Sequence, residues 1–181
     1  MALLDAAGNP APDKWTVLAD DSEAPPAGAI IVGAGRLRRD RDVLAARGAP
    51  LGVLLGPAVA PDSIADLLGQ VTLVAVEFPK YRDGRGFTIA RALREHHGFT
   101  GEIRAVGHIL PDQAIFMLRS GFTSFVPPDG QNLARWPEMI ERAQGHQALA
   151  HGREHALPLF RRIGIPFGDD ELAADRPDYQ I

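Results

Sequence analysis

The stretch VTLVAVEFPKYRDGRGFTIARALREHHGF, residues 71–99, joins the longest apolar run of the chain to a clear helical pattern. The run VTLVAVEF shows apolar residues without alternation, which is typical of a strand covered on both faces. Phe87, Ala90, Leu93 and His97 then recur at the spacing of one helix face. A strand that leads into a helix through the short polar loop PKYRDGRG predicts a β–α unit.

The same alternation extends in both directions along the chain. The β-rich runs are AIIVGA (29–34), LGVLLG (51–56), VTLVAVEF (71–78), EIRAVG (102–107) and FTSFVPP (122–128). Helical patterns separate them, so we predict an α/β fold: a doubly wound, mainly parallel five-stranded sheet with helices on both faces, flavodoxin-like or receiver-like. A fragment of a (β/α) barrel is the rival architecture, although the chain falls short of the roughly 250 residues of a full barrel.

Three regions follow from this pattern. Residues 1–28 are rich in Pro, Gly, Ala and Asp and are expected to form a loose arm, in which KWTVLA (14–19) is a candidate edge strand. Residues 29–145 hold the predicted α/β domain. Residues 146–181 are expected to form a helical and irregular tail.

Composition excludes several classes of function. The 181 residues contain no cysteine, so disulfides, thiol nucleophiles and cysteine-bound iron–sulfur clusters are excluded. The net charge of −4 gives no general attraction for nucleic acid or anionic membranes, and neither is expected as a partner. Because the N-terminus lacks a basic segment followed by a long apolar one, and no apolar run could span a bilayer, we expect a cytoplasmic protein.

Polar residues gather where the predicted strands end, which is where open α/β sheets bind ligands. Of the chain's 19 basic residues only Lys14 and Lys80 are lysines, and clustered arginines can bind oxyanions with two parallel hydrogen bonds. The candidates for an anion pocket are Arg85, Arg104, His108 and Gln113, supported by Glu77, Asp83, Gly84 and Asp112. No metal site and no catalytic residue are predicted.

Each candidate also has a structural explanation. Asp83 and Gly84 are typical of a turn in which Asp binds a nearby N–H and Gly takes positive φ. Arg85 either binds an oxyanion or pairs with Glu77, Asp83 or Asp112. Arg104 lies inside a predicted buried strand, and pairing with Glu77 is favoured over a ligand contact.

Further residues are expected to serve the fold. His108 is expected to be a hydrogen-bonded loop histidine, and Asp112 and Gln113 begin a helix, where capping is the default role. Arg91 and Arg94 are expected to be solvated or to pair with Glu95 on the polar helix face.

Two known patterns fail to match. VGAGRLR (32–38) follows a strand, but Arg38 stands where a dinucleotide fingerprint requires its third glycine. FPKYRDGRG resembles the segment after the third strand of a receiver, but the acidic residues and the lysine of phosphotransfer are missing. No cofactor is therefore evident.

Residues 78–125, FPKYRDGRGFTIARALREHHGFTGEIRAVGHILPDQAIFMLRSGFTSF, carry a closer resemblance. They are similar to the bacterial family called domain of unknown function 934, whose pattern includes FP-x-F/Y-x-DGR, A-R-x-LR, G-E-L/I-RA-x-G, DQ and GF. His108 departs from that pattern, because members often have Asp there, and the long tail after Gly145 also looks unlike the family.

The resemblance implies a role in sulfite reduction, because the family is described as an oxidoreductase of that process. We therefore expect an accessory protein or oxidoreductase component of assimilatory sulfite reduction with an oxyanion pocket. The implied partners are sulfite reductase or another sulfur-assimilation protein, and a small oxyanion. The alternative is a non-catalytic α/β module that docks on a reductase through its helices or tail.

Overall fold

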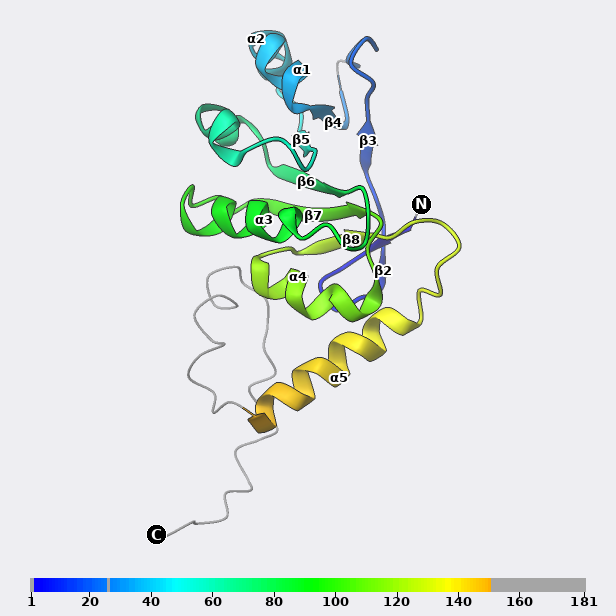
Figure 1. Ribbon diagram of the computed structural model, residues 1–181. Helices are drawn as coiled ribbons and strands as arrows, with labels where there is room; N and C mark the ends of the chain where they lie inside the picture. Colours follow the sequence, from blue (N-terminus) through cyan, green and yellow to red (C-terminus); the bar gives the residue numbers. More distant parts are fainter. Residues whose placement is uncertain (1, 26, 151–181) are drawn as a thin grey trace.

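The chain is described by a computed structural model that covers residues 2–25 and 27–150, and within them it forms one mixed sheet of eight strands flanked by helices (Figure 1). The strands are β1 (Leu3–Leu4), β2 (Pro10–Ala11), β3 (Trp15–Val17), β4 (Ala29–Gly33), β5 (Leu51–Leu55), β6 (Leu73–Phe78), β7 (Glu102–Gly107) and β8 (Ser124–Val126). The α-helices are α1 (Ala34–Arg39), α2 (Arg41–Ala46), α3 (Arg85–Glu95), α4 (Ala114–Ser120) and α5 (Arg135–Ala150). The 3-10 helices are η1 (Pro61–Gln70) and η2 (Pro111–Gln113).

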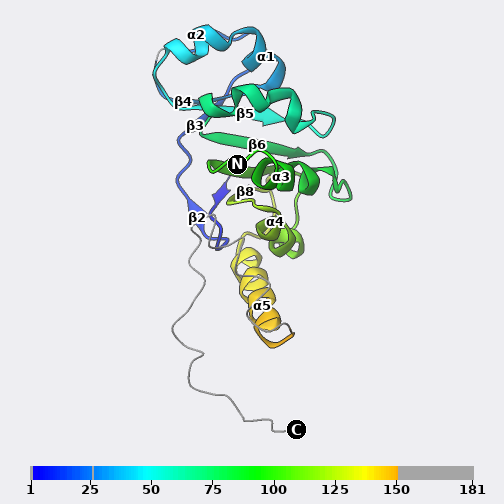
Figure 2. The same ribbon diagram turned by 90° about the vertical axis from the view of Figure 1, so that its left-hand side faces the viewer.

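The α/β class is confirmed, but the doubly wound five-stranded sheet is wrong. The strand order is β2-β1-β8-β7-β6-β5-β4-β3, in which β3 to β8 follow one another in sequence and are parallel. β1 runs antiparallel to both β2 and β8. Because crossovers between parallel strands are right-handed, a sequential order places the crossover helices on one face of the sheet. α1, η1, α3 and α4 indeed stack in front of the strands in Figure 2, an order that resembles the rival barrel fragment.

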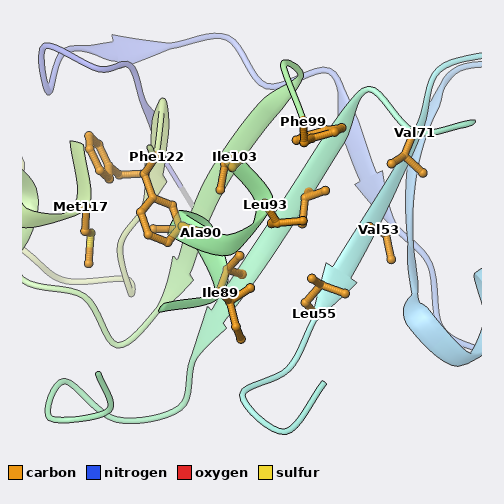
Figure 3. Packing of buried hydrophobic residues seen from close by; sticks show 14 of the residues in the cluster. Val53, Leu55, Val71, Ile89, Ala90, Leu93, Phe99, Ile103, Met117 and Phe122 are labelled. Atoms are coloured by element: carbon orange, nitrogen blue, oxygen red, sulfur yellow. The ribbon is translucent and has the colours of Figure 1, made fainter. Parts of the chain in front are cut away.

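The face that meets the helices, called here the outer face, holds the main core. β6 contributes Val74, Val76 and Phe78, all at most 1% exposed, and α3 faces them with Ile89, Ala90 and Leu93 (Figure 3). The run VTLVAVEF thus supplies a strand that lies inside the sheet, between β5 and β7, with its outer face buried. Each β–α unit folds as expected because its strand and its helix present apolar faces that can only be buried together.

The sheet curls strongly, and a short linker explains why. In a flat sheet, the edge strands β2 and β3 of the eight would lie about 34 Å apart, at about 4.8 Å per strand gap. Only residues 12–14 connect Ala11 of β2 to Trp15 of β3, and this segment spans about 14 Å when fully extended. The sheet must therefore curl until its two edges approach each other, which gives it an inner, concave face.

The inner face is buried without helices. Ile31, Leu73 and Ala75 form a small apolar cluster there, and Trp15 packs against it. A Cβ atom placed on Gly52 would lie 3.2 Å from the Trp15 ring, so this glycine makes room for the indole. The N-terminal residues expected to be a loose arm thus supply strands to the sheet and a cover for its inner face, and the segment KWTVLA contains β3, which lies at one edge of the sheet.

Helix α5 covers the outer core beside β8. Trp136 of α5 is fully buried, and its ring centroid lies 5.2 Å from that of Phe125 in β8. The predicted tail continues α5 as far as Ala150, and the remainder of that prediction lies outside the described residues. Within residues 2–25 and 27–150 no helix has both the length and the apolar character required to cross a membrane.

Candidate functional site

The loop from Pro79 to Gly84, which joins β6 to α3, is held from two sides. Within the loop, the Asp83 N–H donates to the Lys80 carbonyl oxygen at 3.0 Å. From outside, Gln113 Nε2 donates to the Tyr81 carbonyl oxygen at 2.7 Å, and its Oε1 accepts from the Leu110 N–H at 3.1 Å. Both ends of the Gln113 amide are therefore engaged, and this side chain ties the loop to the start of the η2–α4 segment.

Arg85 binds Asp83 with two parallel hydrogen bonds, from Nε and Nη2 of its guanidinium. Nε donates to Oδ1 at 2.9 Å and Nη2 donates to Oδ2 at 2.6 Å, while the Arg85 N–H donates to Oδ1 at 3.2 Å. The side-chain hydrogen bonds from Arg85 lower the pKa of Asp83 from 3.8 to about 2, and the same bonds raise the pKa of Arg85. Of the alternatives left open by the sequence, the structure contains the ion pair with Asp83 and the turn bond from Asp83 to a nearby N–H.

The two glycines of the DGRG segment have different roles. Gly84 was expected to take positive φ, and this is wrong: its φ is −77°, because it caps the N-terminus of α3 in a helical conformation. A Cβ atom on Gly84 would have no neighbour within 4 Å. A Cβ atom on Gly86 would lie 2.4 Å from Cζ of Phe78, so Gly86 is required by the close approach of that ring to the first turn of α3.

His108 and Asp112 lie at the same end of the sheet and are exposed. The His108 N–H donates to the Phe78 carbonyl oxygen at 2.8 Å, directly after Gly107, which has φ +95°. His108 is thus placed by its backbone at the exit of β7. Gln113 caps η2 as expected, through its bond with the Leu110 N–H.

Arg104 lies on the inner face, in an ionic cluster with Asp13 and Glu102. Its side chain is 3% exposed, its Nη1 lies 2.9 Å from Asp13 Oδ2, and its Nη2 lies 2.9 Å from Glu102 Oε1. Ser124 Oγ donates to the same Glu102 oxygen at 2.6 Å. The expected pair with Glu77 is wrong, because the segment that crosses the inner face brings Asp13 to Arg104, whereas Glu77 is exposed near the carboxyl end of β6.

The structure therefore brings only part of the predicted pocket together. Arg85, His108 and Gln113 lie at the carboxyl end of the sheet, Gln113 as a support for the loop before Arg85. Arg104 is separate, buried on the inner face. An open, mostly apolar groove of about 280 Å³ lies beside Arg85, between the loop after β5 and the start of α3, and it is lined by Pro57, Ala58, Val59, Ala60, Arg85, Thr88 and Ile89.

Arg94, expected on the polar helix face, is instead partly buried and structural. Its Nη1 donates to the carbonyl oxygens of Phe99 and Gly101 at 2.6 and 2.8 Å, and its Nε and Nη2 donate to that of Gly121 at 3.0 and 2.8 Å. Burial lowers the pKa of this guanidinium to about 10. Gly121, which ends α4 with a φ of +102°, supplies one of these carbonyls. This glycine is the one feature of the sequence that pointed to the contact. The expected pairing of Arg91 with Glu95 is present at 3.4 Å.

Asp13, like Arg94, has a structural role that the sequence did not indicate. It stands in a Pro-rich segment that looks like a linker, and only the curl of the sheet brings it to a strand 91 positions away. Among the side chains that the structure describes, in residues 2–25 and 27–142, no three of His, Asp or Glu are placed to hold a metal ion.

Comparison with known proteins gives one match. The sequence model of the family described as bacterial protein of unknown function (DUF934) matches residues 52–159, more than half of the chain. The matched span includes the DGRG segment, α3, β7 and Arg104 with Glu102 and Ser124, whereas Asp13 lies outside it. No curated protein matches the chain.

Proposed function

Because the chain belongs to the DUF934 family of bacterial proteins of unknown function, we propose that it is a non-catalytic α/β module that docks on a reductase of sulfur assimilation, with sulfite reductase as the first candidate. The sulfur context comes from the description of the family that the sequence resembles. The docking role comes from the way in which the polar residues of the chain are used.

One observation carries the docking role: the two arginines expected to bind an anion are engaged by carboxylates of the protein. Asp83 binds Nε and Nη2 of Arg85, and Arg104 is bound by Asp13 and Glu102. An arginine that forks onto a carboxylate has used the geometry with which it would bind an oxyanion. The negative charge of Asp83, 2.6 Å from Arg85, also repels an incoming anion.

A second candidate is the oxyanion site of a sulfite-reducing component, which the groove beside Arg85 favours. Arg85 and Thr88 stand in the first turns of α3, where the helix dipole attracts negative charge. An anion that binds Nε and Nη2 of Arg85 with two hydrogen bonds would have to displace Asp83. This exchange makes the second candidate weaker than docking.

The docking role is tested by sedimentation velocity of the purified chain with sulfite reductase from the same organism. We expect a faster-sedimenting complex at protein concentrations of about 10–50 µM, as for transient interfaces. An unrelated protein of similar net charge serves as the control and should leave the chain unshifted. Separate boundaries for the chain and the reductase throughout this range would contradict the proposal, and so would reduction of sulfite by the chain alone.

A further inference from the structure

Two aromatic rings stand out from the surface at the carboxyl end of the sheet. Tyr81, in the loop after β6, is 48% exposed, and Phe116, on α4, is 57% exposed. The hydrogen bond from Gln113 Nε2 to the Tyr81 carbonyl oxygen holds that loop against the start of α4, and Phe116 lies one helical turn after Gln113. Figure 1 shows the loop and the start of α4 at the same end of the sheet.

Cations flank these rings. Lys80 and Arg82 adjoin Tyr81 in the loop, and the Arg82 guanidinium lies 5.3 Å from the centre of the Tyr81 ring. Arg119 is exposed one turn after Phe116 on α4. The surface made by Lys80, Tyr81, Arg82, Phe116 and Arg119 is called here the aromatic–cation surface.

Other exposed arginines form ion pairs with carboxylates of the protein. Arg38, Arg41 and Arg91 pair with Asp66, Asp42 and Glu95 at 3.0, 3.3 and 3.4 Å. In the described part of the chain, Lys80, Arg82 and Arg119 form no such ion pair. Lys80 helps to lower the pKa of Asp83 and Arg82 lies over the Tyr81 ring, but all three side chains are exposed, so carboxylates of a partner can reach them.

We infer that the aromatic–cation surface docks an acidic segment of a partner protein, an inference that rests on the docking role proposed above. Exposed aromatic rings supply the apolar anchors of protein interfaces, and arginine beside them is typical of interface hot spots. Three cations without ion pairs complement carboxylates and speed the encounter with them.

A protein segment fits this surface better than nucleic acid or a lipid headgroup layer. The chain carries a net charge of −4, which repels a polyanion as a whole. The exposed Asp112 also stands at the start of the segment that carries Phe116, so a continuous phosphate backbone would meet a carboxylate there. A short acidic segment with one apolar side chain can avoid this position.

The surface is tested by NMR titration of the ¹⁵N-labelled full chain with a short synthetic peptide of aspartates and glutamates around one tryptophan and one leucine. We expect shifts of the amides of Tyr81, Arg82, Phe116 and Arg119. The affinity should fall by about tenfold in the Arg82→Ala/Arg119→Ala double variant and by about fivefold in Phe116→Ala. Arg41→Ala is the matched control. It removes an exposed arginine on α2, beside the β3–β4 edge of the sheet, and should bind the peptide as the unchanged protein does.

The outcomes separate this inference from the docking role. No binding of the peptide, equal affinity in the double variant, or shifts confined to other surfaces would overturn the inference. Binding of an RNA oligonucleotide or of phosphatidylserine vesicles that the double variant abolishes, without peptide binding, would also overturn it. If sulfite reductase binds the chain and the double variant equally, the inference about the aromatic–cation surface is wrong, while the docking role stands. If the peptide binds as expected and the reductase does not, the surface stands and the docking role fails.

Discussion

Replacing Gly86 with alanine is expected to lower the free energy of unfolding by about 2–3 kcal/mol, as for overpacking of a filled core. The added methyl would lie 2.4 Å from Cζ of Phe78, well inside van der Waals contact. The ring cannot turn aside easily, because it is 1% exposed and packs against Phe87 and Phe122 at centroid distances of 5.4 and 5.8 Å. The better helix propensity of alanine offsets only about 1 kcal/mol of this strain.

Gly84→Ala is the matched control within the same DGRG segment. Its φ of −77° suits alanine, and its Cβ would have no neighbour within 4 Å. We expect the stability to stay within about 0.5 kcal/mol of the unchanged protein or to rise slightly. Urea denaturation measures both variants, and equal losses in the two would contradict the packing of Phe78 against α3.

Replacing Arg104 with methionine is expected to cost about 2–3 kcal/mol of stability, because it leaves two carboxylates without their cation. Methionine retains much of the apolar stem but none of the bonds to Asp13 and Glu102. The cost stays below that of a fully buried pair, because the side chains of Asp13 and Glu102 are 33% and 30% exposed and can take up water. The loss should also release the segment that carries Asp13 from the inner face.

Arg91→Met on α3 is the control for the arginine-to-methionine change. The side chain of Arg91 is 66% exposed and its pair with Glu95 is open to solvent, so we expect a change of at most about 0.5 kcal/mol. Thermal and urea denaturation measure the two variants side by side. An Arg104→Met variant as stable as Arg91→Met would show that the ionic cluster does not hold the inner face together.

The β–α units were predictable from sequence because their determinants are local. β6 is almost entirely apolar and α3 places its apolar residues on one face, so both follow from residues 71–99 alone. The curl of the sheet was not predictable in this way. It depends on residues 12–14, which must join strands that end up at opposite edges, and no local pattern encodes that distance.

The sequence predicted which residues lie in the candidate site better than it predicted the partners that they bind. Asp83 and Arg85 are two positions apart, so their pairing was among the alternatives that the sequence offered. The partner of Arg104 was not, because Asp13 reaches it only through the curl. Arg94 was placed on the wrong side of its helix, since the carbonyls that bind it belong to Phe99, Gly101 and Gly121, and the loop geometry that gathers them is tertiary.

The polar junction between β6 and α3 serves the fold, and this role is tested by calorimetric titration of the full chain with sulfite, sulfate and adenosine phosphates. We expect no saturable heat with any of these anions, either in the unchanged protein or in Arg85→Lys, a variant that keeps the charge but loses the paired hydrogen-bond geometry. A one-to-one binding isotherm in the unchanged protein that weakens by about 1–3 kcal/mol in Arg85→Lys would contradict it, because Arg85 would then bind an oxyanion in place of Asp83.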